Sequence, residues 1–274
     1  MLKCAITGAK GVLGKRIRKI LPYRFYPFKK NIENSNEVNK WINLRKYDLV
    51  IHLAAIVPTK KVSKNYKRAK SVNIQGTKNI VNAVLNTKYP PKWFFYASTS
   101  HVYSTKFRNK KISETSTINP YTKYGKTKRE GEKIIEKNFQ NKKTKFCIGR
   151  IFSFTDKNQK KPFLIPSLVE KIKKRTDTKI VIENIDHYRD FLPTKDIALA
   201  IKILFNKKCI GIYNIGSGKK INLKNIALLI GKKNKKKIYF KKNNKVTYLV
   251  SNINKIKSLG WKPSKFKKNI DYFY

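Results

Sequence analysis

The stretch TGAKGVLG, residues 7–14, constrains the fold of this chain more than any other segment. It follows the apolar run KCAIT and opens the amphipathic segment VLGKRIRKIL. Glycines at this spacing allow a tight turn from a strand into a helix, and they let backbone N–H groups approach a pyrophosphate at the positive end of that helix. The stretch therefore predicts a dinucleotide-binding loop. Its expected cofactor-binding residues are Gly8, Lys10, Gly11, Val12, Leu13 and Gly14.

Short apolar runs alternate with amphipathic segments along residues 1–155. The runs KCAIT, YRFYPF, YDLVIHLAA, KWFFYAST and TKFCIGRIF are typical of buried strands, and the segments between them have helical spacing. This alternation predicts an α/β fold, a doubly wound parallel sheet that binds a dinucleotide. Residues 156–274 follow a looser pattern. We expect them to form a smaller mixed α/β substrate lobe, in which residues 184–205 fold back onto the sheet.

The composition is strongly basic, with 65 basic and 15 acidic residues and a net charge of +50. Such a charge ordinarily suggests nucleic-acid binding, but the lysines are spread along the whole chain, so no dedicated nucleic-acid role is expected. No apolar run approaches the roughly 18 residues that span a bilayer, and the segment after Met1 has no secretory pattern. We therefore expect a cytoplasmic protein without a membrane segment.

The three cysteines, Cys4, Cys147 and Cys209, are odd in number and widely separated. They favour neither a disulfide framework nor a zinc site, and no other cluster has metal-ligand spacing. We expect no metal, and we interpret the cysteines as small buried apolar residues in a reducing compartment.

Three Y-x-x-x-K pairs occur in the chain: Tyr26 with Lys30, Tyr66 with Lys70, and Tyr124 with Lys128. A chain with this many lysines produces about three by chance, so the spacing alone indicates nothing. Only Tyr124 follows a strand end rich in hydroxyl groups, FFYASTSHVYS, which contains Thr99. There the Lys128 ammonium is expected to lower the pKa of the Tyr124 phenol, which could then exchange a proton with a substrate oxygen held by Thr99.

The end of the second strand bears on the choice of cofactor. An acidic residue at this place would accept hydrogen bonds from the adenosine ribose and favour NAD, whereas the sequence has YPFKKN with Lys29 and Lys30. These lysines, together with Lys10, suit the 2′-phosphate of NADP. We expect NADP, with NAD as the alternative.

Taken together, these motifs resemble those of the extended short-chain dehydrogenases/reductases that act on nucleotide sugars. The resemblance covers nearly the whole chain and rests on TGAKGVLG, HLAA (52–55), VNIQGT (72–77), STSHVY with YGKTK, YRDFLPTKDIALAI (188–201) and YNIGSGKKINL (213–223). It implies a homodimer in which Thr99, Tyr124 and Lys128 are catalytic. It also implies that Leu53, Ala54 and Ala55 line the nicotinamide, that Arg189 binds the nucleotide phosphates of the substrate, and that Ser100 and His101 contact the substrate.

Two departures from the family pattern narrow the reaction. The dehydratases of this family typically carry acidic residues directly after the catalytic Thr, where this chain has Ser100 and His101, so dehydration is not expected. The short segment between the second and third strands is similar to that of NADPH-dependent keto-sugar reductases. We therefore expect an NADP(H)-dependent reductase of a keto group on a nucleotide-activated deoxysugar. The alternatives are an NAD-dependent 4-epimerase and a Rossmann-fold RNA-binding protein without catalysis.

Overall fold

The computed structural model describes residues 1–57, 59–105, 110–174, 178–242 and 246–264. Its first half alternates strands and helices, as the sequence predicts. The elements of this half are β1 (Lys3–Thr7), α1 (Val12–Ile20), β2 (Arg24–Pro27), α2 (Ser35–Asn43), β3 (Leu49–His52), α3 (Thr59–Lys64), α4 (Tyr66–Lys70), the π-helical turn η1 (Ser71–Gln75), α5 (Gly76–Asn86), β4 (Trp93–Thr99), the 3₁₀ turn η2 (Ser100–Val102), α6 (Lys123–Phe139) and β5 (Lys145–Ile151).

Six strands form the main sheet in the order β2-β1-β3-β4-β5-β10, and every neighbouring pair is parallel. The last of them, β10 (Gly211–Ile215), comes from the second half of the chain. The chain leaves β1 toward β2 on one side and later returns to β3 on the other. In doubly wound sheets this switch point opens the crevice in which ligands bind. The predicted fold class is confirmed.

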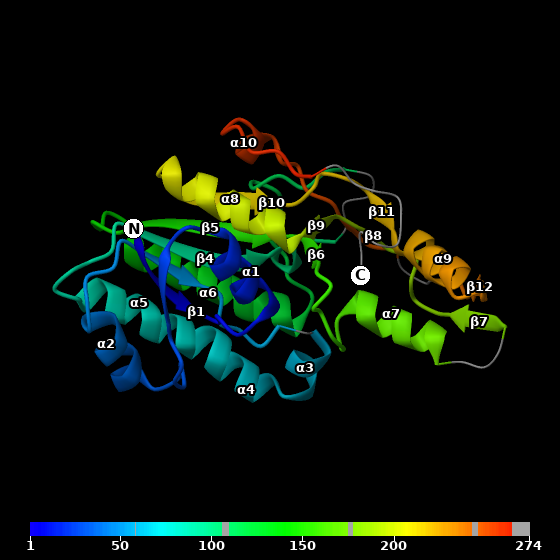
Figure 1. The fold of residues 1–274 in the computed structure, drawn as a ribbon, viewed down its shortest axis with the longest axis horizontal. Coiled ribbons are helices and arrows are strands. Elements are labelled where there is room, and N and C mark those ends of the chain that lie inside the picture. Colours follow the sequence, from blue (N-terminus) through cyan, green and yellow to red (C-terminus); the bar gives the residue numbers. More distant parts are fainter. Residues whose placement is uncertain (58, 106–109, 175–177, 243–245, 265–274) are drawn as a thin grey trace.

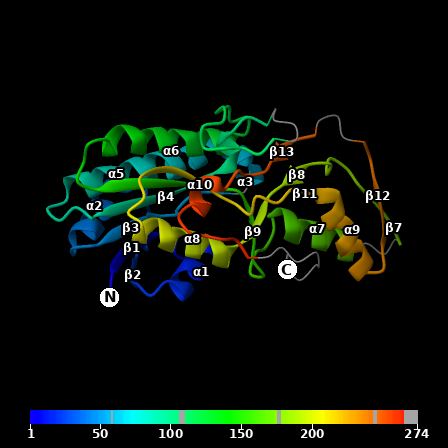
Figure 2. The same cartoon turned by 90° about the horizontal axis from the view of Figure 1, so that it is seen from above.

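Helices cover both faces of the sheet. In Figure 2, α2, α5 and α6 lie on one face, whereas α1 and α8 (Thr194–Asn206) lie on the other. Each layer has its own apolar core: Ile17 and Ile201 belong to the α1/α8 side, and Trp41, Val81 and Ile135 to the opposite side. Because both faces are covered, the inner strands β1, β3, β4 and β5 are largely buried, which is why they appear in the sequence as continuous apolar runs, whereas the edge strand β2 is only partly buried.

Side-chain caps set the start of two helices. Asn34 accepts a hydrogen bond from the backbone N of Glu37 at 3.1 Å and begins α2, and Thr122 accepts one from Gly125 N at 2.9 Å and begins α6. Such a cap contributes about 1 kcal/mol. The second cap fixes Tyr124 in the first turn of α6.

The connection from β2 to β3 contains a single helix, α2, as the short segment predicts. No further strand pairs with the outer side of β2 among the described residues, so β2 is the edge of the sheet. The segment that follows β2 therefore lies at the rim of the molecule.

The second half of the chain forms a smaller lobe and returns part of its length to the sheet. Its further elements are β6 (Ser153–Thr155), α7 (Leu164–Lys173), β7 (Lys179–Ile182), β8 (Tyr188–Arg189), β9 (Phe191–Pro193), β11 (Ile221–Asn222), α9 (Leu223–Lys233), β12 (Lys237–Phe240), β13 (Tyr248–Leu249) and α10 (Asn254–Lys257). Figure 1 shows α7, α9, β7 and β12 gathered at one end of the molecule. These elements share an apolar core. More chain returns to the sheet than the expected residues 184–205, because β10 joins it as well.

A buried carboxylate joins the lobe to the sheet. Asp190, between β8 and β9, accepts hydrogen bonds from the backbone N atoms of Ser217, Gly218 and Ser251 and from both serine hydroxyls. The two loops that it holds lie after β10 and after β13. One side chain therefore fixes how the strand bearing Arg189 meets the main sheet.

Two further features concern the chain as a whole. Cys4, Cys147 and Cys209 are buried and carry no disulfide. In the part of the chain that the structure describes, no helix has the length and apolar character needed to cross a membrane.

Glu132 on α6 forms a buried ion pair with Arg150 on β5. Nε and Nη2 of Arg150 each donate to one oxygen of Glu132 at 2.9 Å, and the two side chains are nearly inaccessible to solvent. Ser98 and Arg129 donate to the same carboxylate. The pair therefore ties α6 to the ends of β4 and β5.

Replacing Glu132 by Gln should lower the free energy of unfolding by about 3–5 kcal/mol, because the Arg150 charge would remain buried without its counter-charge. Denaturation in urea would measure the change. Glu130→Gln on the same helix is the matched control, since its exposed pair with Lys133 is worth less than about 0.5 kcal/mol. Equal losses in the two variants would contradict the role of the buried pair.

Candidate active site

The glycine loop packs directly against the end of β3. Gly8 has φ +69°, and a Cβ there would lie 2.8 Å from the backbone N of Ala54, while one on Gly14 would lie 2.4 Å from the Gly8 carbonyl oxygen. Only glycine permits this approach. The backbone N atoms of Leu53 and Ala54 donate to the Thr7 hydroxyl at 3.2 and 3.1 Å. The structure therefore brings the two predicted cofactor segments together.

The start of α1 has the form expected of a phosphate-binding helix N-terminus, in which backbone N–H groups face the ligand. Gly11 is its N-cap and makes no side-chain cap hydrogen bond, and its backbone N donates to the Gly8 carbonyl at 3.0 Å. Lys10 and Gly11 are exposed, whereas Val12 and Leu13 are half-buried in the first turn of the helix. The loop thus offers backbone rather than side chain to a pyrophosphate, which fits a dinucleotide.

Thr99, Tyr124 and Lys128 meet at the carboxyl edge of the sheet. Thr99 ends β4, and its hydroxyl is hydrogen-bonded to that of Tyr124. Lys128 lies one turn along α6, almost fully buried, with Nζ 3.9 Å from the centroid of the Tyr96 ring. Close approach of α6 depends on Gly125, since a Cβ there would lie 2.2 Å from the His101 carbonyl oxygen.

The protonation of this group differs from the expectation that Lys128 lowers the pKa of Tyr124. Burial raises the pKa of Tyr124 to about 12, and the hydrogen bond from Thr99 opposes this only in part. Burial also lowers the pKa of Lys128 to about 7, against the attraction of Glu132. Desolvation dominates both shifts because both groups are packed away from water. Tyr124 therefore holds its proton at neutral pH, as a proton donor must.

The predicted substrate residues lie on the other side of Tyr124. Ser100 is buried in η2, and the His101 ring meets the Tyr124 ring edge to face, with centroids 5.9 Å apart. Burial, and then the charge of Arg189, lowers the pKa of His101 to about 4. Arg189 itself donates to the backbone carbonyls of Tyr188 and Thr247 and to the Thr247 hydroxyl. The structure thus brings Arg189 within electrostatic reach of His101.

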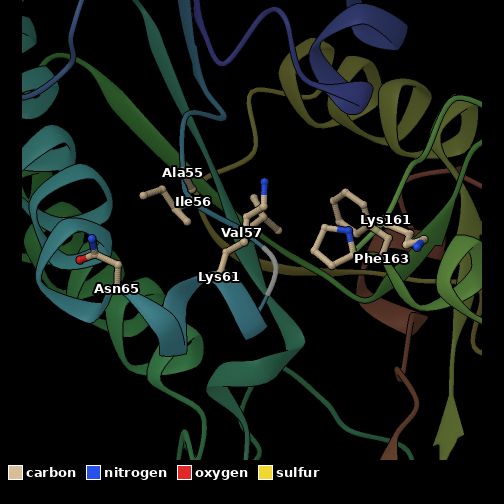
Figure 3. Close-up of a pocket in the computed structure, with 8 residues that line it drawn as sticks. Ala55, Ile56, Val57, Lys61, Asn65, Lys161 and Phe163 are labelled. Atoms are coloured by element: carbon tan, nitrogen blue, oxygen red, sulfur yellow. The ribbon is translucent and has the colours of Figure 1, made fainter.

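A cleft of about 490 Å³ opens between the two parts of the chain (Figure 3). One wall consists of residues 55–57, which follow β3, together with Lys61 on α3 and Asn65 directly after α3. The other wall consists of residues 161–163, which lead into α7. The lining residues are Ala55, Ile56, Val57, Lys61, Asn65, Lys161, Pro162 and Phe163. Thr99, Tyr124 and Lys128 do not line it. Ile56 and Val57 connect this cleft with the group of Thr99, Tyr124 and Lys128, because they also pack against the apolar cluster that contains Tyr124.

Lys29 and Lys30 lie elsewhere, exposed after β2 at the edge of the sheet. Within the described residues no group of three or more His, Cys, Asp or Glu side chains is placed to hold a metal ion.

The geometry of the glycine loop and of the Thr99, Tyr124 and Lys128 group can now be compared with known proteins. The family described as GDP-mannose 4,6 dehydratase matches residues 13–271 of the chain. The chain belongs to this family. The predicted resemblance to the extended short-chain dehydrogenases/reductases that act on nucleotide sugars is thereby confirmed, and the protein is an enzyme of this type.

Members of several reaction types resemble this chain. The dTDP-D-glucose 4,6-dehydratase of Dictyostelium discoideum is 27% identical over 223 residues, which cover 77% of this chain and 50% of that relative, so the chain spans half its length. The GDP-6-deoxy-D-mannose reductase of Pseudomonas aeruginosa is 24% identical over 239 residues, covering 82% of this chain and 78% of the relative. Among solved structures, RMD from Pseudomonas aeruginosa complexed with NADPH superposes with a TM-score of 0.88 at 21% identity, covering 98% of this chain and 95% of that one.

In this member of the GDP-mannose 4,6 dehydratase family, Asn73 is a site residue that the sequence analysis did not assign. It lies in the π-helical turn η1, and such turns are frequent at functional sites. Its side-chain oxygen accepts a hydrogen bond from the backbone N of Ile56, and its side-chain nitrogen donates to the Ile56 carbonyl and to the Thr127 hydroxyl. Thr127 in turn donates to the Tyr124 carbonyl. Asn73 thus holds the cleft wall against the helix of Tyr124. A buried Asn within VNIQGT is the signal that could have found it.

His52 occupies a structural position. Its two ring nitrogens are hydrogen-bonded to the hydroxyls of Thr7 and Thr77 at 2.6 and 3.0 Å. Burial, with a smaller effect of the Lys128 charge, lowers the pKa of His52 to about 3. In the unfolded chain the histidine pKa is about 6.5, so below this pH His52 binds a proton in the unfolded chain while it stays neutral in the folded one.

Stability should therefore fall as the pH decreases below about 6.5, by about 1.4 kcal/mol per pH unit for each histidine kept neutral by folding. Urea denaturation at several pH values between 4.5 and 7 measures this slope. His52→Gln should be less stable than the parent chain at pH 7, because two hydrogen bonds are disturbed, and yet show a shallower slope. An unchanged slope in this variant would mean that His52 does not titrate as described.

Proposed function

We propose that this protein is an NADP(H)-dependent oxidoreductase that reduces a keto group of a nucleotide-activated deoxysugar. The observation that carries the proposal is the buried, protonated Tyr124, hydrogen-bonded to Thr99 beside a strand end that bears Ser100 and His101 in place of carboxylates. A tyrosine that holds its proton can donate it to a carbonyl oxygen, which is the requirement of the reducing direction.

NADPH, when bound at the glycine loop, supplies the hydride. Thr99 holds the substrate carbonyl oxygen by a hydrogen bond, and Tyr124 donates the proton that this oxygen needs when it becomes a hydroxyl. Lys128, with a pKa of about 7, can carry a positive charge at neutral pH and stabilise the phenolate left on Tyr124. The forked guanidinium of Arg189 can bind the diphosphate of the substrate at two points.

The residues after Thr99 distinguish reduction from dehydration. Water loss requires an acid for the leaving hydroxyl as well as a base for the neighbouring carbon. Ser100 is a poor acid, and the pKa of about 4 keeps His101 neutral at pH 7, so neither side chain donates a proton to a departing hydroxyl. This argument favours reduction although the family carries the name of a dehydratase.

NADP is favoured over NAD by what surrounds the end of β2. Lys29 and Lys30 are exposed there, and Glu33, the first carboxylate after the strand, is already bound by the Ser71 hydroxyl and by Arg68. A carboxylate engaged in this way is a poor acceptor for the ribose hydroxyls of NAD. The two lysines suit a 2′-phosphate.

Titration calorimetry should accordingly give tighter binding of NADPH than of NADH. Replacing both Lys29 and Lys30 by Glu should reverse the preference, because the 2′-phosphate would then meet negative charge. Lys137→Glu is the matched control. This exposed lysine lies in the last turn of α6, the helix that precedes β5, and its replacement should leave the preference unchanged. A clear NADH preference in the parent chain would remove this support for the reductase, and NAD that stays bound through purification would favour the 4-epimerase.

Tyr124→Phe should lower turnover by about 10²–10⁴ while leaving the fold and NADPH affinity intact, since only the oxygen that donates the proton is lost. NADPH oxidation would be followed with GDP- and dTDP-linked 4-keto-6-deoxysugars at saturating cofactor. Tyr26→Phe, in another of the Y-x-x-x-K pairs, serves as control and should keep full turnover. Undiminished turnover of Tyr124→Phe would show that Tyr124 and Lys128 have this spacing by chance in a lysine-rich chain.

The proposal includes a cytoplasmic homodimer. Light scattering coupled to size-exclusion chromatography tests the oligomeric state.

A further inference from the structure

Lys128 carries its charge in a place that disfavours charge. It is only 1% exposed, and burial lowers its pKa to about 7. The proposed reduction leaves a phenolate on Tyr124, and a protonated ammonium is needed to stabilise it. The groups around Lys128 therefore decide at which pH the enzyme can work.

Within the described residues, the negative charge that acts on Lys128 is shared with two arginines. Glu132 lies one turn further along α6 and opposes the effect of burial on the pKa of Lys128. Its carboxylate also accepts hydrogen bonds from Arg129 on the same helix and from Arg150 on β5. Two positive charges thus already face this carboxylate, which limits what it contributes to a third.

The remaining titratable groups around Lys128 are uncharged at neutral pH. Burial is the main reason why His52 on β3 has a pKa of about 3. Burial also raises the pKa of Tyr124 to about 12 and the pKa of Tyr96 well above its ordinary value. Any further stabilisation of the ammonium has to come from a neutral group.

Tyr96 on β4 contacts both the ammonium and the backbone of Lys128. Nζ lies 3.9 Å from the centroid of the Tyr96 ring, closer than in any other contact between a cation and an aromatic ring in the described part of the chain. The Tyr96 hydroxyl lies 3.5 Å from the Lys128 carbonyl oxygen. Gly131 makes room for this hydroxyl, since a Cβ there would lie 2.1 Å from it. The Tyr96 side chain therefore fits closely against α6.

The face of an aromatic ring is negative and attracts a cation, and the attraction grows when water is excluded. Tyr96 is fully buried, and Lys128 is nearly so. We propose that Tyr96 is a positioning residue, whose ring face holds the Lys128 ammonium in place and keeps it charged. The consequence for turnover rests on the proposed reductase function, whereas the effect on the charge of Lys128 does not.

Three replacements separate the ring face from the rest of the Tyr96 side chain. Tyr96→Phe removes only the hydroxyl. A trifluorinated phenylalanine at the same position keeps the shape of the ring but loses its negative face, because fluorine withdraws electrons from the ring. Tyr96→Leu removes the ring altogether. Phe94→Leu is the matched control, because Phe94 lies on the same strand and in the same apolar cluster but packs against Phe139.

The kinetic test is the pH at which turnover falls on the alkaline side, where Lys128 loses its proton. NADPH oxidation with GDP- and dTDP-linked 4-keto-6-deoxysugars would be followed at saturating cofactor from about pH 5.5 to 9.5. The parent chain, Tyr96→Phe and Phe94→Leu should lose turnover at the same pH. The fluorinated variant and Tyr96→Leu should lose it about 0.5–1.5 pH units lower, because their ammonium gives up its proton more readily.

A stability measurement tests the contact without any substrate. Lys128, with a pKa of about 7, is charged in the folded chain at pH 6 and neutral at pH 9, so the ring face contributes only at the lower pH. The fluorinated variant should therefore lose stability relative to Tyr96→Phe at pH 6, and this difference should shrink at pH 9. Urea denaturation of both variants at the two pH values measures it.

A fluorinated variant whose turnover falls at the same pH as that of Tyr96→Phe would overturn the role of Tyr96. So would a stability difference that is the same at pH 6 and pH 9, or an equal pH shift in Phe94→Leu. If the parent chain reduces none of the keto-sugars, the reductase function fails, and the urea comparison alone decides whether Tyr96 holds the ammonium.

Discussion

The buried Glu132 carboxylate is the interaction on which the geometry of the site depends. It lies one turn after Lys128 and is bound by Ser98, directly before Thr99, and by Arg150 on the next strand. These contacts fix the position of α6 along its axis relative to the ends of β4 and β5. They thereby also fix the distance from Thr99 to Tyr124. The same carboxylate opposes the desolvation of Lys128. A structural ion pair thus also affects how readily the Lys128 ammonium loses its proton.

The sequence was sufficient to predict the features that depend on local geometry. Gly8 could be placed in a turn from strand to helix because TGAKGVLG follows an apolar run and opens an amphipathic segment, and the structure gives it φ +69° beside the backbone of Ala54. The chance pairs could be set aside because only Tyr124 follows a strand end rich in hydroxyl groups. Helical spacing alone would not have separated them, since Tyr66 and Lys70 lie one turn apart on α4 just as Tyr124 and Lys128 do on α6, and only Tyr26 lies on a strand.

Features that depend on contacts between distant segments could not be predicted. Asn73 meets Ile56 and Thr127 across 17 and 54 residues, and no spacing rule connects such positions. The pKa of Tyr124 was expected in the wrong direction because Tyr124 is buried in a cluster with Val62 and Ala69, residues of α3 and α4 that a sequence pattern does not place beside α6. The run GIYNI gave no sign of its partner either, so the return of β10 to the sheet became visible only through its pairing with β5.

The edge position of β2 has a consequence for the catalytic cycle. A reductase of the proposed kind uses one NADPH for every sugar and must exchange it each time, whereas an epimerase regenerates its nucleotide in place. In this chain the strand that leads to Lys29 and Lys30 has no outer neighbour among the described residues, so the adenosine end of a bound dinucleotide would lie at the rim of the sheet. The adenosine end of a dinucleotide held there would not be enclosed by a further strand of the sheet. The short β2–β3 connection therefore suits a cycle in which the dinucleotide binds and dissociates as a co-substrate in every turnover, rather than staying bound as a permanent cofactor.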